Sequence, residues 1–110
     1  MRRGEIWTAA AGSGYAGKPR PVVIVQDDRF AATASVTVCA GTTDPTDAPL
    51  FRLLLDADEM TGLREPTRLM VDKLTTVPRS KLGERIGCLR DEDMVRLDRA
   101  ILVFLGIAGD

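Results

Sequence analysis

Arg20 stands between two prolines, where a glycine-rich stretch gives way to the apolar run 22–25. Each proline fixes its own backbone, and Pro21 also restricts the residue before it, so this arginine is held on a rigid segment. A guanidinium mounted in this way is suited to a phosphate group, which it can bind through two parallel hydrogen bonds. The spacing alone also allows a surface arginine in a salt bridge.

Thr42 and Thr43 follow Gly41 at the far end of an alternating stretch. A threonine hydroxyl can donate one hydrogen bond to a phosphoryl oxygen, and the adjacent glycine lets an anionic ligand approach closely. The same Gly-Thr-Thr-Asp-Pro run is also typical of an ordinary turn. The two threonines are therefore a second candidate site, with a turn as the alternative.

Asp72 and Lys73 are adjacent charged residues inside an otherwise apolar stretch. Neighbouring residues of a strand point to opposite faces, so one of the two must face inward, into a groove or across an interface. A solvated edge strand is the alternative for this pair.

Tyr15 and Lys18 belong to a stretch, 11–18, that has three glycines and no periodicity, which predicts a loop. Such a loop could close over a nucleic-acid strand, with Tyr15 stacking on a base and Lys18 meeting a phosphate. Composition alone is equally compatible with a loop that has no role.

Histidine is absent from the chain, and this excludes several kinds of site at once. Ser-His-Asp sites, Cys-His sites and most zinc sites need it. Cys39 and Cys88 cannot by themselves complete a structural zinc cage, and in a cytosolic protein free thiols are favoured over a disulfide. We therefore expect any catalysis to use carboxylates, lysine, arginine, tyrosine or hydroxyl groups.

The net charge of −1 and the pI near 5.4 argue mildly against a general nucleic-acid binder. The segment 64–85 nevertheless has six basic residues against three acidic ones, so a locally basic groove is compatible with the sequence. The longest apolar runs, 21–25 and 100–105, are far shorter than the ~20 residues of a membrane span. The first residues lack the apolar segment of a signal peptide, so we expect a single cytoplasmic domain over 1–110, away from membranes.

The elements that must position these residues are mostly short strands. Apolar alternation and turn signals predict strands over 4–10, 22–25, 34–40, 50–55, 69–77 and 83–89. A polar loop at 41–49 and an acidic connection at 56–66, with room for one helical turn, separate three of them. Strands this closely spaced exclude βαβ units and indicate a mainly β fold, a small curled antiparallel barrel.

A terminal helix follows the last strand. Asp91 can cap it, and the apolar residues Met94, Leu97, Ile101 and Leu105 recur at helical spacing and predict a buried stripe. Gly106 is a natural end for this helix. We therefore expect the helix to pack against the barrel.

Several of these stretches together resemble the MazF/PemK family of ribonuclease toxins of type II toxin–antitoxin systems. The likeness begins with Arg3-Gly4-Glu5-Ile6-Trp7 and continues through the glycine-rich loop to the Arg-Pro strand at 20–25. It then includes the Gly-Thr-Thr motif at 41–43, Pro49, the strand 51–55 and the helix end at 102–106. It covers nearly the whole chain, and the opening motif with the Arg-Pro strand is its most specific part.

The resemblance implies an SH3-like, CcdB/PemK-like barrel that forms a homodimer and needs no metal and no other cofactor. It implies a sequence-specific endoribonuclease that cuts single-stranded RNA and leaves a 2′,3′-cyclic phosphate and a 5′-hydroxyl. Arg20 and Thr42 are then the catalytic residues, and a cognate antitoxin occupies the RNA groove. Expected RNA contacts come from Tyr15, Lys18, Thr43, Asp72 and Lys73.

The proton acceptor of that reaction is the least defined group. Arginine stays protonated in proteins, so Arg20 cannot act as a conventional base. In some relatives an acid and an arginine on the later strand transfer protons, and here Asp72 followed by Lys73 stands at the corresponding place. Asp72 is therefore the candidate acceptor. This chain also reads Thr8-Ala9-Ala10 where many relatives have an acidic residue.

Two other functions compete with the ribonuclease. One is a non-enzymatic toxin similar to CcdB, which has the same fold and poisons DNA gyrase by binding. The other is a barrel module that binds a partner and has lost its activity. The presence of Arg20 and Thr42 favours the ribonuclease.

Overall fold

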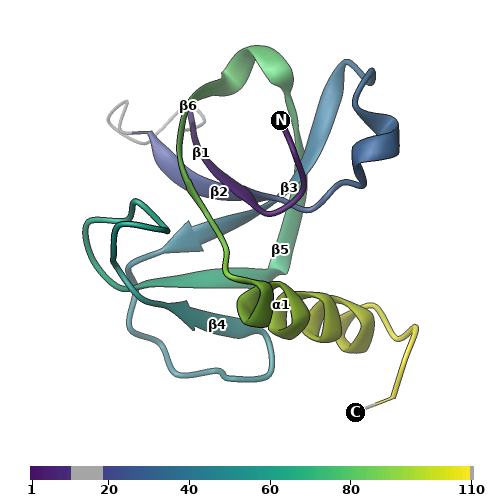
Figure 1. Ribbon diagram of the computed structural model, residues 1–110. Helices are drawn as coiled ribbons and strands as arrows, with labels where there is room; N and C mark the ends of the chain where they lie inside the picture. Colours follow the sequence, from purple (N-terminus) through teal and green to yellow (C-terminus); the bar gives the residue numbers. More distant parts are fainter. Residues whose placement is uncertain (11–18, 110) are drawn as a thin grey trace.

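A curled antiparallel sheet followed by one helix makes up the computed structural model, which describes residues 1–10 and 19–109 (Figure 1). The strands pair in the order β4-β5-β3-β2-β1-β6. They are β1 (Glu5–Ala9), β2 (Arg20–Ile24), β3 (Ser35–Thr42), β4 (Arg52–Leu55), β5 (Thr67–Pro78) and β6 (Leu82–Cys88). The helix α1 (Asp91–Phe104) contacts β4 and β5, and the 3₁₀ turns η1 (Asp28–Phe30) and η2 (Arg79–Lys81) lie in two connections.

The predicted mainly β fold with a C-terminal helix is confirmed, with the sheet curled but not closed. β4 and β6 are its two edges, and every neighbouring pair is antiparallel. Residues of the Arg3–Trp7 motif hold the edge strand β6 against its neighbour β1. The Glu5 carboxylate accepts a hydrogen bond from the indole of Trp7 at 3.0 Å and forms an ion pair of 3.2 Å with Arg85 of β6.

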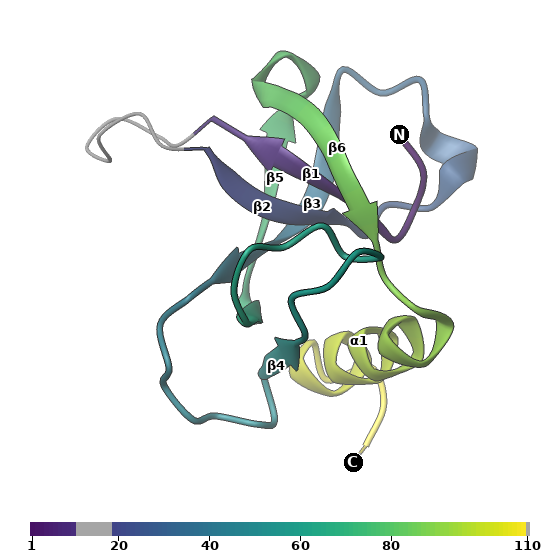
Figure 2. The same cartoon turned by 60° about the vertical axis from the view of Figure 1, so that its left-hand side comes forward.

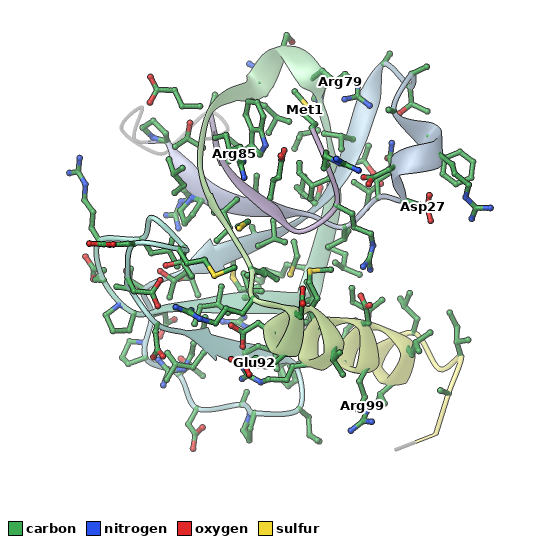
Figure 3. The ribbon with its side chains drawn as sticks, viewed as in Figure 1. Met1, Asp27, Arg79, Arg85, Glu92 and Arg99 are labelled. Atoms are coloured by element: carbon green, nitrogen blue, oxygen red, sulfur yellow. The ribbon has the colours of Figure 1, made fainter. Side chains whose placement is uncertain are left out.

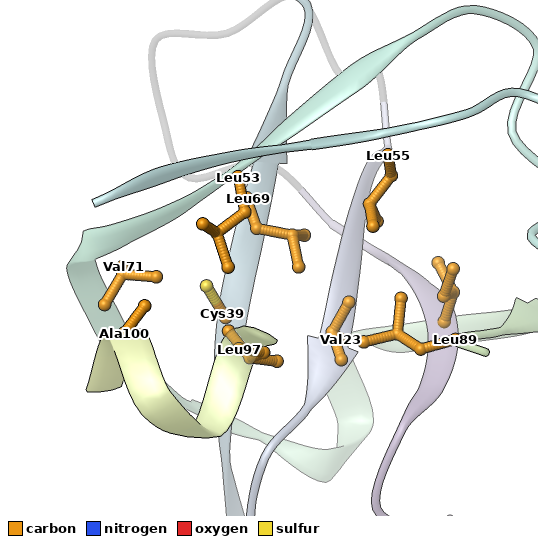
Figure 4. Close-up of a cluster of buried hydrophobic side chains, with 10 residues drawn as sticks. Val23, Cys39, Leu53, Leu55, Leu69, Val71, Leu89, Leu97 and Ala100 are labelled. Atoms are coloured by element: carbon orange, nitrogen blue, oxygen red, sulfur yellow. The ribbon is translucent and has the colours of Figure 1, made fainter. Parts of the chain in front are cut away.

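The curl encloses two clusters of apolar side chains, one on each face of the sheet. Alternation along β3 places Val36 and Val38 in one cluster and Cys39 in the other. Ile6 and Trp7 of β1 are divided in the same way, as predicted. The cluster under α1 contains Ile6, Val23, Cys39, Leu53, Leu55, Leu69, Val71, Leu89, Leu97 and Ala100 (Figure 4).

The helix differs from its prediction at both ends. Asp91 was expected as the N-cap, but it is the first helical residue, and the cap position is taken by Arg90 in an extended backbone conformation. Leu105 was expected in the buried stripe, but the helix ends at Phe104 and Leu105 is 55% exposed. The predicted stop at Gly106 is confirmed by its left-handed φ of 75°, which glycine adopts without strain.

Strand boundaries differ from the predicted ones by up to two residues. β4 begins at Arg52 rather than at Leu50, because the N–H groups of Phe51 and Arg52 both bond the carbonyl of Ala48 in a turn. β5 begins at Thr67, two residues earlier than predicted. Within 1–10 and 19–109, no helix is both long and apolar enough to cross a membrane.

Candidate active site

Arg20 and Thr42 lie at the same end of two neighbouring strands. Arg20 is the first residue of β2 and Thr42 is the last residue of β3. These strands are antiparallel, with Val22 opposite Ala40, so the start of one and the end of the other meet at one edge of their ladder. The curl of the sheet opens a groove at this edge.

Both side chains line this groove, which has a volume of about 770 Å³. The connection between β4 and β5 forms its other wall and passes the end of β3 in both ribbon views (Figures 1 and 2). The residues that line it are Thr8, Pro19, Arg20, Pro21, Gly41, Thr42, Thr43, Gly62, Leu63, Arg64, Glu65, Thr67, Glu84 and Ile86. Two arginines and two glutamates thus face one open groove.

Arg20 is fixed by the strand and not only by its two prolines. Its backbone is paired with Ala9 of β1, while Pro21 is paired with Thr8. The guanidinium therefore starts from a backbone that both its local sequence and its cross-strand neighbour hold in place. The side chain itself is half-buried.

The Thr42 hydroxyl is oriented by the loop that follows it. Its oxygen accepts a hydrogen bond of 3.1 Å from the Asp44 N–H. The hydroxyl can still donate its own proton to a second partner, such as a ligand in the groove. The Asp44 carboxylate in turn accepts two bonds from Thr46, and these hold the pKa of that carboxyl below its ordinary value. The ordinary turn that the sequence left as the alternative is not formed, because Thr42 ends β3 and the loop 43–48 contains no regular turn.

Gly41 forms the floor of the groove, and its lack of a side chain is required there. A Cβ at this position would lie 2.6 Å from Cγ2 of Thr67 and 3.4 Å from Cγ of Pro21. The close approach of β2, β3 and β5 at this point brings Arg20 and Thr42 to the same opening.

The far wall is held by a buried network within the connection between β4 and β5. The Thr61 hydroxyl, fully buried, donates to the carbonyl of Asp56 at 2.9 Å, while the Asp58 carboxylate accepts the Thr61 N–H at 3.0 Å. Asp58 also forms an ion pair of 2.8 Å with Arg90. The Thr61 N–H and then the Arg90 guanidinium hold the pKa of the Asp58 carboxyl below its ordinary value.

Two glycines let this connection lie directly on β6. A Cβ on Gly62, whose φ is +70°, would meet the carbonyl oxygen of Ile86 at 1.8 Å, and one on Gly87 would meet that of Thr61 at 2.2 Å. The N–H of Cys88 bonds the carbonyl of Met60 at 2.9 Å across the same contact. The segment that presents Arg64 and Glu65 to the groove is therefore anchored at its base.

Asp72 and Lys73 are not brought to the groove. Asp72 lies on the face of the β4–β5 pair opposite the core, where its carboxylate binds Arg52 at 2.8 and 3.1 Å. The hydrogen bond from Arg52 holds the pKa of Asp72 below its ordinary value. Lys73 is exposed. The expected inward-facing charge is therefore not found at the groove: Asp72 is paired with Arg52 and neither residue lines it.

Three further expectations concern residues around the groove. Thr43 lines it as expected, while Tyr15 and Lys18 lie outside the described residues. The sequence left a locally basic groove possible, and of the six basic residues between 64 and 85 only Arg64 lines the groove. Arg79, for example, lies beside Met1 away from the connection (Figure 3).

Both cysteines are free thiols, as expected. Burial raises the pKa of the Cys39 thiol to about 12, with a smaller effect from Asp72, and Cys88 is half-buried. In the part of the chain that the structure describes, no group of three or more acidic or cysteine side chains is arranged to hold a metal ion.

Thr8, Arg64, Glu65 and Glu84 are groove residues that the sequence did not single out. They come from three separate stretches of chain, and no local spacing relates them. The fold thus brings to one groove of a small curled-sheet protein an arginine and a threonine, two residue types that can donate hydrogen bonds to a phosphoryl oxygen.

Comparison with known proteins gives the family. A sequence profile described as PemK-like, MazF-like toxin of type II toxin–antitoxin systems matches residues 2–105. A probable endoribonuclease MazF from Mycolicibacterium smegmatis is 63% identical over 109 residues, which are 99% of this chain and 100% of the relative.

Solved structures agree with this match. Mycobacterium tuberculosis toxin MazF-mt6 superimposes with a TM-score of 0.78 and 27% identity, over 93% of this chain and 96% of that one. A mycobacterial endoribonuclease in complex with its cognate antitoxin has the same fold, with a TM-score of 0.78 at 22% identity over 100% and 99% of the two chains.

The chain belongs to the PemK-like, MazF-like family of toxins of type II toxin–antitoxin systems. The relative is named as an endoribonuclease, which favours the ribonuclease over the gyrase-binding alternative.

Proposed function

We propose that this MazF-type toxin cuts single-stranded RNA at short sequence motifs, in the groove between Arg20 and Thr42. The ribose 2′-hydroxyl attacks the adjacent phosphorus and the 5′-oxygen leaves, which gives a 2′,3′-cyclic phosphate and a 5′-hydroxyl. The observation that carries the proposal is that the guanidinium and the hydroxyl, 22 positions apart in the sequence, line one open groove.

The chemistry fits a chain without histidine. The substrate supplies the nucleophile, so the protein needs neither a nucleophilic side chain nor a metal-bound water. Its task is to align the attack and to stabilise the extra negative charge on the phosphoryl oxygens. Arg20 can bind two of these oxygens at once, and Thr42 can donate to one of them.

Single-stranded RNA suits both the reaction and the groove. In-line attack by the 2′-oxygen requires a backbone that can leave the regular helical geometry. Thr43 and Arg64 line the groove beside the catalytic pair and are placed to bind neighbouring nucleotides. We extend this surface to Tyr15 and Lys18, which the sequence places directly before the Arg-Pro step. Asp72, bound to Arg52, is not part of it.

The proposal is tested by incubating the purified protein with single-stranded RNA in EDTA and analysing the product ends. Cleavage with cyclic-phosphate ends is expected, and Arg20→Ala or Thr42→Ala should abolish it without unfolding the protein. Thr75→Ala, at an exposed position of β5 away from the groove, is the matched control and should keep full activity. Intact RNA, or cleavage that survives in both groove variants, would overturn the proposal.

We also propose a homodimer, supported by an apolar surface along α1 and the turn before β4. Val95, Leu102 and Leu50 are exposed there, the last at 77%, around a second hollow of about 810 Å³. Covering such a surface with a second copy stabilises a small domain. Light scattering should give twice the chain mass, and Leu102→Glu should give a monomer; a monomeric parent protein would contradict this.

A cognate antitoxin is the proposed inhibitor, and the cytoplasm, where messenger RNA is available, is the proposed location. One structural neighbour of this chain is an endoribonuclease in complex with its cognate antitoxin. A polypeptide that covers the groove would exclude RNA from Arg20 and Thr42. Addition of the antitoxin should therefore stop cleavage in the assay above, and undiminished cleavage would contradict this mode of inhibition.

A further inference from the structure

The cleavage proposed above needs a group that accepts the proton of the attacking 2′-hydroxyl. General-base catalysis requires that group to lie within hydrogen-bond reach of the substrate. Asp72 is excluded because its carboxylate binds Arg52 outside the groove. Among the described residues, the acidic ones that line the groove are Glu65 and Glu84, and the stretch 11–18 contains neither aspartate nor glutamate.

Glu84 lies in a bulge of β6 directly beside β1. Trp7 pairs with Arg85 and Ala9 pairs with Leu82, so the single residue Thr8 stands opposite two residues of β6. An extra residue of this kind bends the strand and redirects its side chains, and bulges are common beside active sites. Figure 2 shows β6 running along β1 at this edge of the sheet.

The bulge is held in place by a groove residue. The Glu84 N–H donates a hydrogen bond of 2.9 Å to Oγ1 of Thr8. This contact depends on Gly83, because a Cβ there would lie 2.6 Å from the same oxygen. Thr8 lies on β1 opposite Pro21 of β2. Glu84 is therefore linked through the Thr8 hydroxyl to β1, the strand that pairs with the one carrying Arg20.

Glu65 lies on the opposite wall and has a different support. It precedes Pro66 in the connection before β5, and its carbonyl accepts a hydrogen bond from the Thr67 hydroxyl at 3.0 Å. Its backbone is not part of a strand. Glu65 is therefore a carboxylate of the same kind in the same groove, without the link to β1 and β2.

We propose that Glu84 is the catalytic base of RNA cleavage, which rests on the function proposed above. The Glu84 carboxylate takes the proton of the 2′-hydroxyl as the 2′-oxygen forms its bond to phosphorus. The bond from phosphorus to the 5′-oxygen breaks, and the leaving oxygen takes a proton from water. The protonated Glu84 then returns its proton to the hydroxide that this leaves, so atoms and charges balance.

The test compares Glu84→Gln with the matched variant Glu65→Gln in steady-state cleavage of one RNA oligonucleotide. Gln keeps the size of the side chain and the backbone bond to Thr8 but cannot accept the proton. We expect kcat to fall at least about 100-fold in Glu84→Gln with KM changed little, and the loss of kcat in Glu65→Gln, which changes the same groove, to be clearly smaller. Glu84→Asp, which keeps the acid on a shorter side chain, should fall between them.

A pH profile provides a readout that a merely structural role would not change. A carboxylate base acts only when ionised, so the parent protein should lose activity on the acid side, and Glu84→Gln should lose that limb. In the part of the chain that the structure describes, the charged residues that share the groove with Glu84 are Arg20, Arg64 and Glu65. The Glu65→Gln profile should keep its acid limb.

The outcomes separate this inference from the function on which it rests. If the parent protein leaves RNA intact, the proposed function fails. If the parent cleaves RNA and folded Glu84→Gln, checked by circular dichroism, cleaves it equally well, the inference alone is overturned. Loss of activity in Glu65→Gln with full activity in Glu84→Gln would also overturn it.

Discussion

Two pairs of polar side chains lie on neighbouring strands of this sheet, and their surroundings differ. Arg20 and Thr42 stand where the β2–β3 ladder ends and face an open groove. Arg52 and Asp72 lie on the β4–β5 pair and bind each other at 2.8 Å. The position at the end of a ladder leaves an opening that a ligand can enter, whereas the charges within the β4–β5 ladder bind each other.

The largest expected effect on RNA cleavage comes from removing Arg20, and removal of Arg52 is the comparison. Arg20→Ala should lower kcat/KM for RNA at least about 100-fold, or about 2.7 kcal/mol, because a donor to the charged transition state is lost. Arg52→Ala should leave the rate within a few-fold of the parent. Initial rates on one fluorogenic RNA measure both, and equal losses would break the comparison.

The wall opposite Arg20 is tested by a pair of glycine substitutions. Gly62→Ala should lower the free energy of unfolding by about 3 kcal/mol or more, because the new Cβ meets the Ile86 carbonyl and φ is positive. Gly106→Ala also has a positive φ but meets open space, so about 1–2 kcal/mol is expected. Urea unfolding measures both free energies of unfolding. Similar losses in the two variants would argue against close packing of the β4–β5 connection on β6.

The smallest expected effect is on stability and concerns Arg52 and Asp72, the pair that lies outside the groove. Arg52 lowers the pKa of Asp72 in the folded protein, so its contribution to stability is present above the unfolded pKa, near 4, and is lost as the pH falls below it. Asp72→Asn should remove about 1 kcal/mol at neutral pH, since the pair is partly exposed, and RNA cleavage should stay unchanged.

Unfolding measured between pH 2 and pH 7 checks this pair. The parent protein should lose more stability than Asp72→Asn over the acid range. If the unfolding free energies of the two proteins fall in parallel with pH, the Arg52–Asp72 contact contributes nothing to stability. A large loss of RNA cleavage in Asp72→Asn would show that Asp72 takes part in the reaction after all.

Arg20 and Thr42 could be named as candidates from the sequence because each is marked by its immediate neighbours, and both line one groove. Prolines flank the first, and the second follows a glycine at the end of an alternating strand. Their catalytic role came from the resemblance to the MazF/PemK family and stays a prediction. The fold class could also be predicted, because short alternating runs exclude crossover helices. These features are local, and local rules describe them well.

Other groove residues could not be predicted because contacts between distant segments place them. Glu84 reaches the groove through a bulge opposite Thr8, and Arg64 through a connection that Thr61 and Gly62 fix to β6. Asp72 was assigned to the groove by its charge within an apolar strand. The pairing of β4 with β5 supplies Arg52 as its partner, and no local spacing indicates that contact.

The most direct test of the account is a crystal structure with an RNA that contains the mapped cleavage motif and a 2′-deoxy sugar at the scissile position. This substrate cannot be cut, because it lacks the nucleophile. We expect its scissile phosphate within hydrogen-bond distance of both the Arg20 guanidinium and the Thr42 hydroxyl. A phosphate bound elsewhere, with neither group in contact, would contradict the central claim.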